Sequence, residues 1–301
     1  MSSPVAQVLD AQDVPMRPIK LDSPSRANTR PQSRSPVKSP FFVEPAAVSP
    51  IKINRLAGTV SSIPFPSLDA PCFSLIQETL CHEPFWLLIA VTFLIKTSGK
   101  LAIPVFYAVR ERFPTPTHLA DPASEPELKE MIQHLGLVSN RTTMMQKYAK
   151  GWIENPPTPG VRHRVKGYDK RDADGGLDTG QEASAAEEPD EEWEIGHLTR
   201  GKYALDSWRI FCRDELLGRA QDWNGKGAPP EFQPEWMRTR PNDKELRACL
   251  RWMWMKEGWE WDPVTGEKSA LRPEMAAAVN EHRVEYDDTG GLRILDEPRA
   301  A

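Results

Sequence analysis

Asp243 occupies the position in this sequence that points most directly to chemistry. It follows Arg240-Pro241-Asn242 and precedes Lys244 to Met255, whose apolar spacing predicts an amphipathic helix. A carboxylate at a helix start can cap the helix by accepting backbone amides. It can also stabilise a developing positive charge and orient a water molecule. Spacing alone favours the cap, and the two roles are compatible because a cap fixes the direction of the carboxylate.

A glycine turn, Gly201-Lys202-Tyr203, lies about forty residues before Asp243 and opens a helix predicted over 203–215. Backbone amides at such a turn can hold a phosphate group. Asp206, the other acid in this region, is predicted to serve as a local capping or packing partner. A lone Gly-Lys-Tyr sequence is weak support by itself, so its function depends on the wider pattern.

The elements that must position these residues are helical. Residues 67–153 contain amphipathic repeats around the apolar run Phe85 to Ile95, and residues 193–272 contain eight of the ten tryptophans. The apolar run is too short to span a bilayer, so it predicts a buried core helix. Because a strand pattern of useful length is missing, the sequence predicts an all-α fold.

Cysteines and histidines limit the cofactors that the chain could hold. The four cysteines form no CxxC pair, which indicates free thiols in a reducing compartment and argues against a Cys-ligated iron–sulfur cluster. His82, His134 and His197 lack metal-ligand spacing. We therefore expect no metal and no cofactor. The net charge of −5 over 301 residues averages unlike segments and excludes little.

Several separate motifs occur in the order found in one known family. They are Leu75–Leu80, Pro84–Phe106 including Lys96–Val105, Leu135–Leu137, Gly201–Tyr203 with Asp206–Cys212, and Pro241–Asp243 with Leu246 and Trp252–Trp254. In these motifs the chain resembles the glycosylase domain of the methyl-CpG-binding domain protein 4 family. The members of this family are helix-hairpin-helix DNA glycosylases related to endonuclease III. The resemblance covers about 67–153 and 193–256, and the methyl-CpG-binding domain itself is not visible.

The resemblance implies a monofunctional base-excision-repair enzyme without an iron–sulfur cluster. Such an enzyme removes thymine or uracil mispaired with guanine. The expected partner is double-stranded DNA that holds a mismatched or deaminated base, and the expected form is a nuclear monomer that does not contact membranes. Two alternatives stay open: a DNA-binding protein of the same fold with impaired catalysis, and a glycosylase for another damaged base.

The resemblance also assigns roles to individual residues. Asp243 matches the catalytic aspartate, and Gln77 and Tyr203 match the pocket for the flipped base. Tyr203 stands where bifunctional relatives carry the Schiff-base lysine, so lyase activity is not expected. Lys96 and Leu137 match the residues that enter the duplex, although the family has arginine in place of Lys96. For Leu137 a plain core position is the alternative.

The hairpin residues Arg200, Gly201 and Lys202 are expected to bind DNA, but the hairpin departs from the family pattern. Without a gap, Thr199 and Arg200 replace the first glycine and the apolar residue. If Leu198 is instead the apolar anchor, the turn is one residue short. Either alignment predicts altered hairpin geometry, for which the charge of Arg200 can compensate.

Three segments are expected to lie outside the folded core. Residues 1–66 are rich in serine and proline, with eight basic and four acidic residues, and predict a disordered arm. Its Ser35-Pro36 and Ser49-Pro50 pairs belong either to a plain solvated tail or to a phosphorylation-regulated one. Residues 154–192 predict an acidic disordered insertion, either a plain loop or a shield for the DNA face. Residues 273–301 predict a flexible tail.

Overall fold

The computed structural model describes residues 63–168, 192–287 and 291–298 of the chain. All of them belong to the larger of two units, Asn54–Ala301. The expectations for most of the N-terminal arm and for residues 169–191 of the insertion lie outside the described residues.

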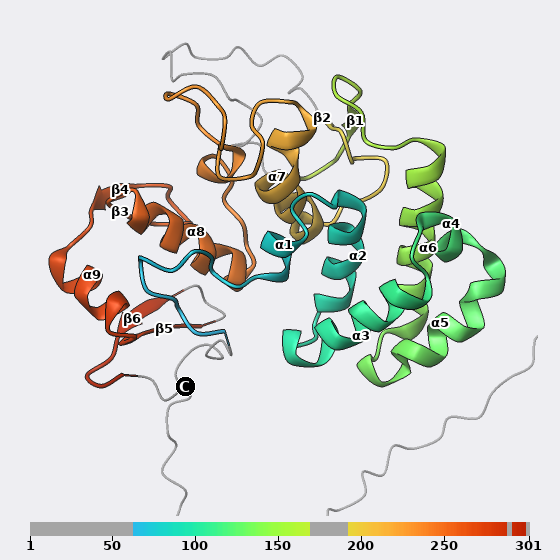
Figure 1. The fold of residues 1–301 in the computed structure, drawn as a ribbon, viewed down its shortest axis with the longest axis horizontal. Coiled ribbons are helices and arrows are strands. Elements are labelled where there is room, and N and C mark those ends of the chain that lie inside the picture. The colour runs from blue at the N-terminus through green and yellow to red at the C-terminus, as the bar shows by residue number, and fades with distance from the viewer. Residues whose placement is uncertain (1–62, 169–191, 288–290, 299–301) are drawn as a thin grey trace, which may run out of the picture. The chain divides into compact units, whose positions relative to one another are not determined.

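Helices make up most of the regular secondary structure described, which confirms the all-α prediction (Figure 1). The α-helices are α1 (Ile76–Thr79), α2 (Pro84–Leu94), α3 (Gly99–Arg112), α4 (Pro116–Ala120), α5 (Glu125–Ile132), α6 (Val138–Glu154), α7 (Lys202–Leu216), α8 (Lys244–Lys256) and α9 (Pro273–Asn280). Short 3₁₀ helices are η1 (Pro122–Ser124), η2 (Gln133–Leu135) and η4 (Glu235–Met237).

Three two-stranded antiparallel ribbons complete the described elements. They pair β1 (His163–Arg164) with β2 (Glu192–Trp193), β3 (Trp259–Trp261) with β4 (Lys268–Ala270), and β5 (Val284–Tyr286) with β6 (Leu292–Ile294). Each strand has only two or three residues, which is too short for a periodic sequence signal.

Helix α2 is the centre of the first half of the fold. Its residues from Phe85 to Phe93 are all buried, because α3, α6 and α7 pack around it. Pro84 starts the helix, where the missing proline N–H costs no hydrogen bond. The predicted buried core helix is therefore present, and none of the described helices is long and apolar enough to cross a membrane.

The prediction of a flexible tail after residue 272 is wrong for most of that segment. Helix α9 and strand β5 bury Met275, Val279, Val284 and Tyr286 in the common core. The Tyr286 ring lies 6.1 Å from that of Phe65, so the folded region also begins slightly earlier than residue 67. These apolar residues are few and widely spaced, which explains why periodicity did not reveal them.

The predicted insertion also has ordered edges. Strands β1 and β2 pair across it, with His163 opposite Trp193. Val165 and Tyr168 are buried. The described N-terminal side of the predicted insertion, up to Tyr168, therefore contributes to the core, and the predicted boundary at 154 is too early.

Candidate active site

Asp243 is the N-cap of α8. Its Oδ1 accepts hydrogen bonds from the backbone amides of Glu245 at 2.9 Å and Leu246 at 3.1 Å. Burial raises the pKa of Asp243, and the nearby Glu245 carboxylate adds to that effect, while the two amides oppose it. The cap thus fixes a carboxylate whose charge is only partly compensated.

Gln77 and Tyr203 meet beside this carboxylate. The Gln77 amide Nε2 donates to the Tyr203 hydroxyl at 3.0 Å, which joins α1 to the start of α7. Burial raises the pKa of Tyr203 well above its ordinary value, and the negative charge of Asp243 raises it further. The structure therefore brings together three predicted site residues from α1, α7 and the start of α8.

Lys96 and Leu137 lie on two separate exposed turns. Lys96 is in the turn between α2 and α3, and Leu137 is the residue before α6. Leu137 is 44% exposed, so the alternative that it is a core residue is wrong. Both have a left-handed backbone, with φ of 55° at Lys96 and 53° at Leu137. That conformation is uncommon for residues with a side chain and often marks functional sites.

The hairpin before α7 has the shorter of its two possible geometries. Leu198 is buried and packs so closely on α6 that a Cβ at Gly151 would lie 2.6 Å from its Cδ2. Leu198 is therefore the apolar anchor. Thr199 is also buried, and its Oγ1 accepts from the Tyr148 hydroxyl at 2.9 Å and from the Gly201 amide at 3.2 Å.

These bonds change what the hairpin offers to a phosphate. The Gly201 amide is already bound to Thr199, so its predicted phosphate contact does not fit this arrangement. Arg200 is exposed. Within the described residues the first turn of α7 has no side-chain cap, so its amides remain the best phosphate donors there.

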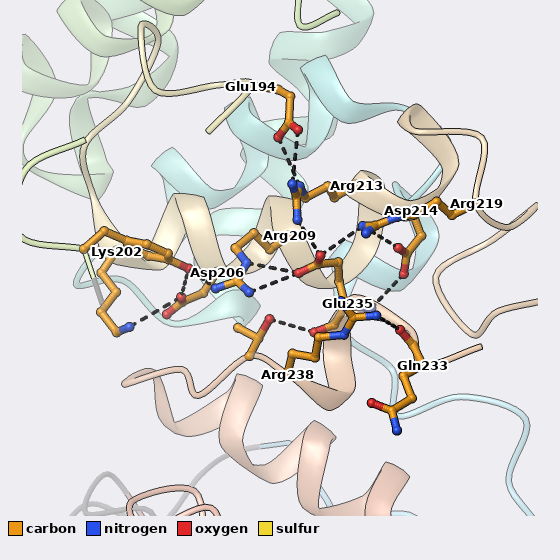
Figure 2. A network of polar contacts seen from close by, with 12 residues as sticks. Glu194, Lys202, Asp206, Arg209, Arg213, Asp214, Arg219, Gln233, Glu235 and Arg238 are labelled. Carbon is orange, nitrogen blue, oxygen red and sulfur yellow. Dashed lines mark hydrogen bonds and ion pairs between the residues drawn. The ribbon is translucent and has the colours of Figure 1, made fainter. Parts of the chain in front are cut away.

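Lys202 is expected to bind DNA, but its side chain is held inside the protein in this structure. Its Nζ is buried and lies 3.6 Å from Asp206 Oδ1 (Figure 2). It also lies 4.8 Å from the centre of the Tyr168 ring. Asp206 also accepts a hydrogen bond from the Tyr168 hydroxyl, as expected of a packing partner. The positive charge of Lys202 pairs with Asp206 inside the protein, because Asp206 is buried on the same helix face, one turn away.

A network of buried charges lies along α7 (Figure 2). Glu235 of η4 pairs with Arg209 at 3.0 Å, with Arg219 at 2.9 Å and with Arg213. Arg213 also binds Glu194 at 3.0 Å. Sequence reasoning missed this network, because its partners are far apart along the chain.

Metal ligands are not clustered in the part of the chain that the structure describes. No group of three or more His, Cys, Asp or Glu side chains there could hold an ion. The four cysteines are free thiols, with Cys72 exposed and the others buried. The arrangement around Asp243 therefore has the chemistry of a carboxylate, an amide and a phenol.

Comparison with known proteins relates part of this chain to a DNA repair enzyme. A stretch of 68 residues is 35% identical to a thymine/uracil-DNA glycosylase from Pyrobaculum aerophilum, and it covers 23% of this chain and 29% of that protein. The chain thus matches less than a third of the relative's length, and no family model matches it. Over this stretch the chain is related to a DNA glycosylase.

Proposed function

We propose that the chain is a monofunctional DNA glycosylase that excises thymine or uracil opposite guanine, with Asp243 as the catalytic carboxylate. The observation that carries the proposal is the Gln77–Tyr203 hydrogen bond, which lies near enough to the capped Asp243 for the charge of that carboxylate to act on Tyr203. The partial match to a protein named thymine/uracil-DNA glycosylase supports the reaction class.

Asp243 supplies the charge that the reaction needs. Cleavage of the glycosidic bond leaves a sugar with positive charge, which a nearby carboxylate stabilises while it orients the attacking water. Within the described residues the hydrogen bonds of Asp243 end on Oδ1. The other oxygen, Oδ2, is therefore the one that acts on the sugar and water.

Gln77 and Tyr203 account for base recognition. A side-chain amide both donates and accepts hydrogen bonds, which matches the imide edge of thymine or uracil. In the proposed complex the flipped base takes the place of the hydrogen bond between Gln77 and Tyr203. Tyr203 cannot form a Schiff base, so the enzyme releases the base without cutting the strand.

Lys96 and Leu137 fit the role of residues that enter the duplex. Both are exposed on turns at the ends of helices. A G·T or G·U pair costs less to open than a Watson–Crick pair, so residues that insert only after opening favour mismatches.

A second candidate function is DNA binding with impaired catalysis. The hairpin favours it, because the Gly201 amide is bound to Thr199 and the Lys202 ammonium is bound to Asp206. Both contacts remove groups that would otherwise hold the phosphate backbone. This candidate predicts that the protein binds mismatched DNA and does not release a base.

One assay separates these candidates. The protein is incubated with duplexes that hold G·T, G·U, A·T or A·U, and abasic sites are then revealed with alkali. Product from the G·T and G·U duplexes that disappears in Asp243→Asn supports the proposal. Binding without product supports the second candidate, and product only from another damaged base shows a different substrate. Strand cleavage without alkali would contradict the role assigned to Tyr203.

A further inference from the structure

Arg141 is a buried arginine whose hydrogen bonds, in the part of the chain that the structure describes, all end on uncharged groups. It lies in the first turns of α6 and is 2% exposed. In the described part of the chain no carboxylate lies within ion-pair distance of its guanidinium, in contrast to Arg209 and Arg213. A buried charge without compensation is costly, so neutral groups must solvate it.

Backbone carbonyls from two turns solvate this guanidinium. On one side Arg141 donates to the carbonyls of Leu135, at 2.8 Å, and Gly136. On the other side it donates to the Ile95 carbonyl at 2.8 Å and to the Thr97 hydroxyl at 2.6 Å.

The second set of partners continues into the end of α2. Arg141 also donates to the carbonyls of Thr92 at 3.3 Å and Phe93 at 3.4 Å. Carbonyls at a helix C-terminus lack partners within the helix and carry partial negative charge. Burial lowers the pKa of Arg141, and these carbonyl dipoles are what compensate its charge.

The two turns that Arg141 joins are those of Lys96 and Leu137. Lys96 lies between Ile95 and Thr97, and Leu137 follows Gly136 directly. In the described residues Lys96 and Leu137 are two of only four non-glycine residues with a left-handed backbone. A left-handed backbone is strained for a residue with a side chain and persists only where its surroundings hold it.

We propose that Arg141 is a positioning residue that sets the spacing between Lys96 and Leu137, and thereby controls how well a paired base is extruded. The inference rests on the proposed function. Arg141 is not a catalytic residue, because its guanidinium is buried against the protein backbone. Lysine cannot replace it, since a single ammonium lacks the planar fork that reaches both turns.

The test compares two substrates that differ only in the cost of extrusion. One duplex holds uracil opposite guanine, and the other holds uracil opposite a tetrahydrofuran abasic-site analogue, where no base pair must be opened. Single-turnover excision rates are measured for the wild-type protein, Arg141→Lys and Arg209→Lys. Arg209 is the matched control because it is an equally buried arginine that contacts neither turn.

Arg141→Lys is expected to lower the excision rate opposite guanine about tenfold or more relative to the rate opposite the analogue, since small misplacements have effects of that size. Arg209→Lys is expected to leave the ratio of the two rates unchanged. If Arg141→Lys does not fold, Thr97→Val removes one contact and should shift the ratio in the same direction by a smaller factor.

Three other outcomes overturn the inference, and they distinguish its failure from that of the proposed function. If the wild-type protein excises uracil but the Arg141 and Thr97 variants keep the wild-type ratio, the inference alone fails. Equal loss on both substrates has the same meaning, because it shows only a structural role. If the wild-type protein excises uracil from neither duplex, the proposed function fails and the inference falls with it.

Discussion

Two carboxylates, the half-buried Asp243 and the buried Glu235, are held in different ways. Asp243 is held by two backbone amides, and burial raises its pKa. Burial also acts to raise the pKa of Glu235, but Arg209, Arg213 and Arg219 outweigh it and hold the pKa at about 2. The negative charge of a carboxylate that is held only by neutral donors can still interact with a bound cationic group. The negative charge of an ion-paired carboxylate is already neutralised by the arginines around it.

The largest expected effect comes from removing the charge at Asp243. Asp243→Asn should lower single-turnover excision of uracil opposite guanine at least about 100-fold, because the transition-state charge loses its partner. Asparagine is an equally good N-cap, so the free energy of unfolding in urea should stay the same or rise slightly. An inactive but also strongly destabilised variant would show that Asp243 is mainly structural.

The opposite result is expected at Glu235. Glu235→Gln leaves three guanidiniums incompletely paired and should lower the free energy of unfolding by about 3–5 kcal/mol. Under conditions where the variant is folded, excision per folded molecule should match the wild type. Urea denaturation followed by active-site-normalised kinetics checks both parts, and a selective loss of excision would contradict the separation of roles.

Acid should remove the contribution of Glu235 in a defined range. Its folded pKa of about 2 lies below the ordinary value of 4.5, so the folded state binds fewer protons than the unfolded state as pH falls. The stabilisation is complete above pH 4.5 and is lost towards pH 2, in total about 3 kcal/mol. The stability difference between wild type and Glu235→Gln should therefore shrink between pH 6 and pH 3. A constant difference would contradict this pairing.

The smallest effect is expected at the hairpin. Thr199→Gly removes the hydroxyl that accepts the Gly201 amide and returns that amide to the solvent side. We expect DNA to bind a few times more tightly, since one more backbone N–H can meet a phosphate. The salt dependence of binding should stay the same because no charge changes. Weaker binding would show that Thr199 shapes the hairpin for DNA.

Much of the fold and the site could be predicted from local sequence. The apolar run of α2 and the cap at Asp243 depend on neighbouring residues, and the ordered motifs placed Gln77 and Tyr203 in one site. The Arg209–Glu235 pair joins residues 26 positions apart, and Arg141 reaches Ile95 across 46 positions. Such contacts depend on how the helices pack, so neither periodicity nor spacing revealed them. The same reason explains the missed packing of Tyr286.

The pH dependence of excision tests the central claim most directly. In the proposed mechanism the ionised Asp243 stabilises the cationic sugar, so the single-turnover rate on a G·U duplex should rise with pH as this group loses its proton. Because burial raises its pKa, the midpoint should lie above the ordinary aspartate value of 3.8, and Asp243→Asn should be slow at every pH. An Asp243→Asn variant that keeps the wild-type rate and profile would contradict the account.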